Sequence, residues 1–311
     1  MVRNKARTVG IEDLKTTRFV GDITDDKVLR EAMTGCDDVY YCVVDTRGWL
    51  TDPSPLYRTN VEGTRNVLDI ATAVHREHPL RRFVYTSSYA TVARRPGRRG
   101  HVATEADEIT DESTLTAYVR TRLVAERMVL AAARHRGLPA VAMCVSTTYG
   151  AGDWGRTPHG AIIAGAALGR LPFILGGIEL EAVGVDDAAR AMILAAEHGR
   201  PGERYLVSDR MISNADVVRI AADAVGVPAP TKTIPLPVAY VLAALGTVKG
   251  RLRGSDERLN LNALRLMRAE APVDCGKAAR ELGWQPRPVE ESIREAARWW
   301  VQLRAAKRAN S

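Results

Sequence analysis

Short apolar runs that alternate with helical patterns constrain the fold of this 311-residue chain more than any other feature. Each run is rich in β-branched or aromatic residues, which is typical of a strand buried on both faces of a parallel sheet. The segments between them place apolar residues at helical spacing and carry capping residues or a closing glycine. The sequence predicts strands over residues 15–23, 38–44, 82–87 and 140–146, and helices over residues 24–33, 61–74 and 118–136. This alternation predicts an α/β fold with a doubly wound parallel sheet.

Composition and charge narrow the class of partner. The chain is 46% hydrophobic and 26% charged, as in ordinary soluble globular proteins. A net charge of +7 would allow a nucleic-acid or anionic-lipid partner. The charge is spread along the chain without a finger, zipper or ribonucleoprotein pattern, so we expect no nucleic acid and no membrane as partner. The exception is a group of four arginines at 94, 95, 98 and 99, which would either clamp an anionic substrate group or lie in a solvated loop.

The cysteines indicate a reducing compartment. Cys36, Cys42, Cys144 and Cys275 form no C-x-x-C pair, and Cys42 and Cys144 fall in apolar runs, so we expect those two to be buried free thiols. The six histidines show no metal-ligand spacing, so we expect no metal. There is no secretory signal pattern, and cytoplasmic localisation is the expectation.

The longest uncharged apolar stretch covers residues 234–248. It is too short to span a bilayer and is interrupted by prolines and a glycine. A core helix, a helix over the substrate and a helix against a second subunit are three readings that the pattern leaves open.

A tyrosine, an arginine and a serine form the candidate reactive group. Tyr118 and Arg122 stand four residues apart on an expected helix, so their Cβ atoms lie roughly 6 Å apart on one face. Ser88 follows the expected strand at 82–87. A cation beside a phenol favours the phenolate, and a serine can hold a substrate oxygen, which suits proton transfer. Taken alone, such a pair is also typical of a solvated helix surface.

Seven segments in order carry a family resemblance. They read GDITD, DVYYCVV, NVEGT, FVYTSS, AYVRTRLVAER, STTYGAGD and VGVDDAARAMILA, and the succession ends in KAARELGWQPRPVEESIREAARWW, so that it covers almost the whole chain. This succession resembles the extended short-chain dehydrogenase/reductases, and more narrowly the NAD(P)-dependent epimerase/dehydratase group near dihydroflavonol reductases and 3β-hydroxysteroid dehydrogenases. The resemblance implies a Rossmann-like domain over residues 1–150, continued at about 180–208. A smaller substrate domain would comprise residues 151–179 and 209–311.

The resemblance also implies roles for particular residues. Tyr118 would be the general acid or base, Ser88 would hydrogen-bond the substrate oxygen, and Arg122 would stand where the family has a catalytic lysine. Asp22 and Ile23 match the pair that contacts adenine, and Arg3 falls where a basic residue favours NADP over NAD. The expected cofactor-binding residues are Arg3, Asp22, Ile23, Val43, Val145 and Thr148.

Three departures from the family pattern stand beside these matches. The chain contains no Gly-x-x-Gly-x-x-Gly turn, the element that binds the pyrophosphate. We expect either an N-terminally shortened version of a longer protein or a protein that has lost dinucleotide binding. Arg122 does not deprotonate as a lysine does, which predicts reduced or altered chemistry. Val43 and Val44 stand where the family usually has small residues, and Val145 stands where it usually has a proline; the larger side chains would crowd the nicotinamide.

The resemblance therefore predicts an NAD(P)-dependent oxidoreductase or epimerase that acts on a secondary alcohol or carbonyl of a small molecule, in an impaired or divergent form. The alternative is a non-catalytic relative with a regulatory or scaffolding role. A homodimer formed through the helices around Val61 and Tyr118 is a further expectation, and the substrate itself is left open.

Overall fold

Four parallel strands form the main sheet of the computed structural model, which describes residues 1–3, 10–93, 100–155, 157–253, 255–257, 259–266 and 271–309. They are β1 (Asp38–Tyr41), β2 (Arg82–Ser88), β3 (Ala140–Val145) and β7 (Arg204–Val207), in the order β1-β2-β3-β7. All six side chains of β3 are buried, as the unbroken apolar run predicts for a central parallel strand. The parallel α/β fold is confirmed.

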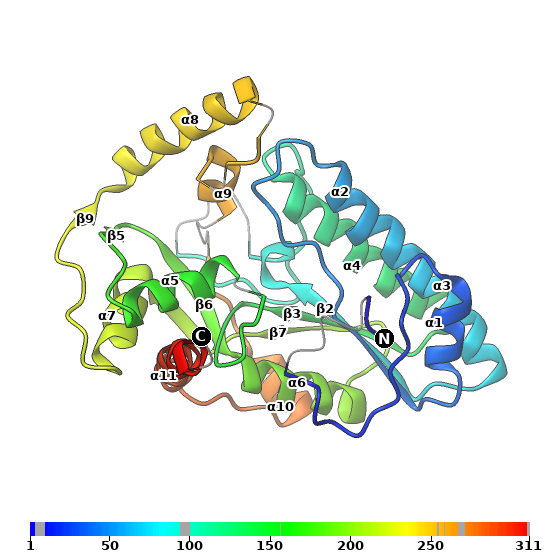
Figure 1. Ribbon diagram of the computed structural model, residues 1–311. Coiled ribbons are helices and arrows are strands. Elements are labelled where there is room, and N and C mark those ends of the chain that lie inside the picture. Colours follow the sequence, from blue (N-terminus) through cyan, green and yellow to red (C-terminus); the bar gives the residue numbers. More distant parts are fainter. Residues whose placement is uncertain are drawn as a thin grey trace.

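Helices cover both faces of this sheet (Figure 1). One layer holds α1 (Asp26–Met33), α3 (Thr64–Glu77) and α4 (Ala117–Arg136), and the other holds α6 (Val185–His198) and α10 (Gly276–Leu282). The expected helix ends are confirmed: the Asp25 carboxylate accepts the Val28 backbone N–H at 3.1 Å, and Gly137 closes α4 with φ +72°.

A π-helical turn precedes α3. After α2 (Ser54–Tyr57), the chain forms the π-helix η2 (Arg58–Gly63), so the α-helix expected from residue 61 begins at Thr64. Inside this turn Asn60 is fully buried and donates to the Asp45 carbonyl and to Thr121 Oγ1, each at 3.1 Å. A Cβ atom at Gly63 would lie 2.2 Å from Cδ1 of Ile23, so this turn packs against Ile23 only because residue 63 is glycine.

The second half of the chain builds a smaller, mixed sheet beside the first. Its order is β4-β6-β8, with β4 parallel and β8 antiparallel to β6. Its helices α5, α7 and α11 pack together around a separate apolar cluster. The elements are β4 (Thr147–Tyr149), α5 (Pro158–Ala167), β5 (Ile174–Leu175), β6 (Glu179–Gly184), β8 (Arg210–Ser213), α7 (Asn214–Asp223), β9 (Thr233–Ile234), α8 (Leu236–Arg253), α9 (Leu261–Leu266) and α11 (Val289–Ala309). The division into domains predicted above stays a prediction.

Three expectations are wrong. The segment expected as a strand at 15–23 makes only one isolated bridge, between Val20 and Val2. The strand expected at 38–44 ends at Tyr41, and Cys42 is exposed rather than buried. The short β1 and the exposed Cys42 follow from position, because among the described residues β1 has a strand on one side only. Cys144, on the central β3, is buried as expected.

Of the three readings left open for the apolar stretch at 234–248, the structure does not support a plain core helix. The helix α8 forms there, but several of its large aliphatic side chains are exposed. Among the described residues, no helix has the length and apolar character needed to cross a membrane.

Candidate active site

The carboxyl end of β2 supplies the first candidate residue. Ser88 is half-buried, and its Oγ accepts the Ala90 backbone N–H at 3.3 Å, which starts the short 3₁₀ helix η3 (Tyr89–Thr91). Val145, at the end of β3, is its ladder partner. The carboxyl ends of parallel strands form the edge at which doubly wound sheets bind ligands. Ser88 and Val145 therefore lie at that edge.

Tyr118 lies in the first turn of α4, which Thr116 caps. It is half-buried and packs with Leu266 of α9 in one apolar cluster. A Cβ atom at Gly48 would lie 2.6 Å from Cδ2 of Leu266 and 3.4 Å from Cβ of Tyr118. The loop after β1 and the helix α9 thus meet beside Tyr118, and the glycine permits their close approach.

Arg122 is buried below Tyr118, with 2% of its surface exposed. Its Nη2 donates to the Thr86 carbonyl, and its Cζ lies 5.1 Å from the ring centroid of Tyr85. Burial alone lowers the pKa of Arg122, but Tyr85 and Tyr118 raise it and the net shift is upward, so the guanidinium stays charged. Its Nε and Nη1 have no hydrogen-bond partner among the described residues. A buried charge with two unsatisfied donors is suited to an oxygen-rich ligand.

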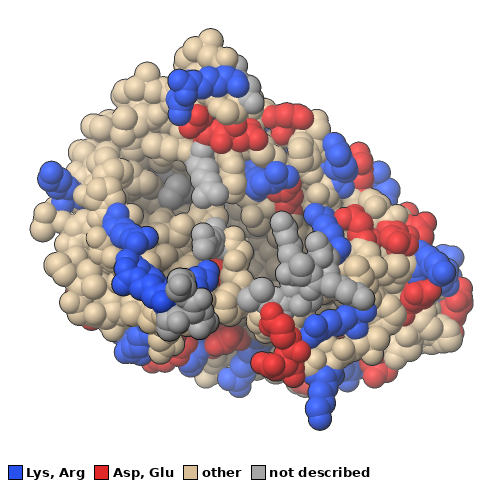
Figure 2. All heavy atoms as spheres, in the orientation of Figure 1, with Lys and Arg blue, Asp and Glu red and all other residues tan. Residues whose placement is uncertain are grey.

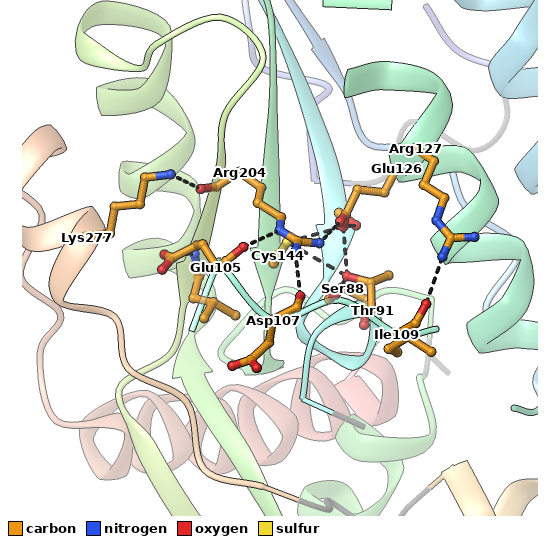
Figure 3. A network of polar contacts seen from close by, with 12 residues as sticks. Ser88, Thr91, Glu105, Asp107, Ile109, Glu126, Arg127, Cys144, Arg204 and Lys277 are labelled. Carbon is orange, nitrogen blue, oxygen red and sulfur yellow. Dashed lines mark hydrogen bonds and ion pairs between the residues drawn. The ribbon is translucent and has the colours of Figure 1, made fainter. Parts of the chain in front are cut away.

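A buried ion pair supports the end of β2 from behind (Figure 3). Glu126 is 1% exposed, and its carboxylate forms an ion pair with Nη1 of Arg204 at 2.9 Å. It also accepts hydrogen bonds from Ser87, from Thr91 at 2.8 Å and from the Cys144 thiol at 3.3 Å. Burial and the neighbouring Glu126 raise the pKa of the Cys144 thiol well above its usual value, so this thiol is unreactive.

The guanidinium of Arg204 reaches further, as Figure 3 shows. Its Nε donates to the Glu105 carbonyl at 2.9 Å and its Nη2 to the Asp107 carbonyl at 2.6 Å. The pair thereby joins α4, β7 and the segment around residue 106 to the residues that flank Ser88. Sequence reasoning missed it; the available signals were Glu126, one turn after Arg122, and an arginine that opens the apolar run of β7.

Three of the predicted cofactor residues line one cavity. Arg3, Asp22 and Ile23 border a space of about 240 Å³, together with Thr24, Arg47, Pro55, Arg58 and Thr59. Arg3 and Asp22 form an ion pair at 2.8 Å. A hydrogen bond from Arg47 lowers the pKa of Asp45 beside this cavity. Three arginines on one small cavity favour an anionic group such as a phosphate.

The other predicted residues lie elsewhere. Val43 is exposed after β1, and Thr148 is exposed on β4 of the smaller sheet; neither lines the cavity. The roles of all nine predicted site residues stay predictions. The four arginines at 94–99 lie outside the described residues. Within the described part of the chain, no group of three or more His, Cys, Asp or Glu could hold a metal ion.

The parallel sheet with helices on both faces places this chain among the Rossmann-like α/β proteins. The residues at the carboxyl edge of the sheet form a candidate proton-transfer site. Residues 2–208 match the NAD dependent epimerase/dehydratase family, and the chain belongs to this family. The resemblance seen in the sequence is thereby confirmed, and the chain is one of a family of enzymes that includes reductases, epimerases and dehydratases.

Individual relatives agree with this assignment. A putative dihydroflavonol 4-reductase of Synechocystis sp. is 28% identical over 96% of this chain and 86% of its own length. Sterol demethylase protein B of Methylococcus capsulatus is 26% identical over 96% of this chain and 89% of its own. The crystal structure of gox2253 superposes with a TM-score of 0.81 at 29% identity, covering 97% of this chain and 89% of that one.

Proposed function

We propose that this protein is an NADP(H)-dependent reductase that interconverts a ketone and a secondary alcohol in an apolar small molecule. The observation that carries the proposal is that Tyr118 lies on α4 one turn before the buried, charged Arg122, with Ser88 at the neighbouring sheet edge. The names of reductases among the relatives support the reaction class.

Tyr118 moves the proton in this proposal. Its hydroxyl donates a proton to the carbonyl oxygen during reduction and takes it back during oxidation, while Ser88 donates a hydrogen bond that orients the same oxygen. Arg122 places its fixed positive charge one helical turn from the tyrosinate that remains after the transfer. Bound NADPH supplies the hydride that reaches the carbonyl carbon.

The described residues fit the adenosine end of a dinucleotide. Ile23 is 4% exposed and offers an apolar contact for a base, and Asp22 offers a carboxylate for hydroxyl groups. The three arginines of the same cavity favour the extra 2′-phosphate, which distinguishes NADP from NAD. In this proposal Arg3, Arg47 and Arg58 together bind the 2′-phosphate.

Apolar surroundings support the substrate class. Leu266, Leu115 and Ile109 share one cluster with Tyr118. One relative carries the word sterol in its name, and another is named a ketoreductase of a farnesyl-bearing quinoline. A steroid-like or isoprenoid ketone is therefore the preferred probe over a nucleotide sugar.

The test combines calorimetric titration with turnover. NADPH and NADH are titrated into the chain and into its Tyr118→Phe variant, and the rate of reduction of a steroid ketone is followed at the nicotinamide absorbance. The proposal expects tighter binding of NADPH and at least a hundredfold lower kcat for Tyr118→Phe at unchanged NADPH affinity. Equal turnover by the variant would overturn the role of Tyr118. Absence of binding by both nucleotides would support the non-catalytic alternative.

A further inference from the structure

The outward side of α8 carries a row of large aliphatic side chains. They recur every three or four residues, so they share one side of the helix. Leu252 is 82% exposed, and Val241 and Leu245 are each 61% exposed. The full row, which we call the α8 ridge, comprises Val238, Val241, Leu242, Leu245, Val248 and Leu252.

Small residues fix the ridge on the outer side. Ala239 and Ala243 are buried on the inner side of the same helix. A Cβ atom at Gly246 would lie 2.0 Å from the Leu259 carbonyl oxygen, and one at Gly250 would lie 2.7 Å from that of Ser255. The helix therefore packs closely through its alanines and glycines. If α8 rotated about its axis to bury the ridge, the large aliphatic side chains would clash with the backbone of the segment that follows the helix.

The ridge is narrow and lies beside positive charge. From residue 238 to residue 252 it is about 21 Å long at 1.5 Å per residue. Figure 2 shows the upper left of the molecule, where α8 lies in Figure 1, as largely uncharged surface, with basic and acidic side chains next to each other at its upper end. Three of the last five residues of α8 are Lys or Arg, and the whole chain carries +7.

These features favour a lipid surface over a second copy. A stable protein interface buries about 800 Å² on each partner, which exceeds what one helix ridge offers. Two copies would also bring two cationic chains together, whereas anionic headgroups attract them. Contact in the plane of the interface needs no spanning segment. The sequence-based expectation of no membrane partner rested on the spread of positive charge along the chain, which does not take account of an exposed apolar ridge.

We propose that the α8 ridge binds the surface of a bilayer that contains anionic lipids. The aliphatic side chains enter the boundary between headgroups and acyl chains. Arg253 lies at the headgroups beside Lys249, which forms an ion pair with Glu257 at 2.8 Å. This inference is independent of the proposed reductase activity, since it concerns a surface outside the candidate active site.

Vesicle sedimentation with the full chain tests it. The probes are vesicles of phosphatidylcholine alone and vesicles with one part in three phosphatidylglycerol. The expected result is binding to the anionic vesicles that falls at least tenfold in the double variant Val241→Ser, Leu245→Ser. The matched control is Ile193→Ser, which removes an aliphatic side chain 52% exposed on α6 and leaves binding unchanged. Circular dichroism verifies that each variant is folded.

Two outcomes overturn the proposal. One is anionic-vesicle binding by the double variant equal to that of the parent chain, which would place the contact elsewhere. The other is no vesicle binding by the parent chain, together with a dimer in light scattering that the double variant disperses. That result would assign the ridge to a second copy of the chain.

Discussion

Substitution of Arg204 by methionine tests the support that the buried ion pair gives to the candidate site. The change removes the only cation that contacts Glu126 among the described residues, while a flexible side chain of similar length fills the space. We expect the free energy of unfolding to fall by about 3–5 kcal/mol, the usual result of leaving one partner of a buried pair uncompensated.

The contacts of each partner support this magnitude. Glu126 keeps its donors Ser87, Thr91 and Cys144, so its carboxylate is still hydrogen-bonded. The carbonyls of Glu105 and Asp107, however, lose the Nε and Nη2 donors. An unsatisfied buried acceptor costs about 1–3 kcal/mol, so these two losses alone reach the lower end of the expected range.

Urea unfolding followed by circular dichroism measures the effect, provided that the m-value stays constant. The double variant Glu126→Gln, Arg204→Met should lose less free energy of unfolding than the two single variants lose in sum, by about 0.5–3 kcal/mol. The matched control is Arg219→Met, which removes an exposed ion pair with Asp216 and should change stability by less than about 1 kcal/mol. The reasoning is wrong if Arg204→Met lowers the free energy of unfolding no more than Arg219→Met does. It is also wrong if the losses of the single variants Glu126→Gln and Arg204→Met simply add up in the double variant.

Three further predictions use other parts of the molecule. Gly63→Ala should lower the free energy of unfolding by about 1–3 kcal/mol in urea titrations, because its Cβ would lie 2.2 Å from Ile23 Cδ1; no change would contradict the packing. Burial lowers the pKa of His159 in the folded protein to about 4, so on acidification the imidazole is protonated in the unfolded chain before it is protonated in the folded one. Tm should therefore fall as the pH drops from about 6.5 to about 4, and it should fall less in the variant His159→Gln. Ellman's reagent should modify Cys36 and Cys42 rapidly in the native protein and the two remaining thiols only after unfolding.

Much of the fold was predictable because its signals are local. The apolar run of β3 and the glycine that ends α4 act through their own backbone and nearest neighbours, so their pattern can be read directly. The same holds for the relation between Tyr118 and Arg122, which helical spacing alone places on one face. Membership of the family followed from the order of such segments along the chain.

The candidate site was predictable only in part. Ser88 at a strand end and Tyr118 on the following helix could be read from the sequence, but the neighbours of Arg122 could not. Its bond to the Thr86 carbonyl and its place over the Tyr85 ring depend on how α4 lies across β2. The pairing of Glu126 with Arg204 joins residues 78 positions apart, beyond the reach of any local pattern.

The sequence by itself determined that strands alternate with helices, roughly where three of the four strands and all three helices lie, and to which family the chain belongs. Only the tertiary structure decided which side chains are buried. The runs that hold Cys42 and Cys144 look alike, yet β1 has a strand on one side among the described residues and β3 has one on each side. Likewise most of α8 is apolar, and the close contacts of Gly246 and Gly250 set which aliphatic residues face outward. Burial depends on neighbours distant in sequence, and hydrophobicity does not specify them.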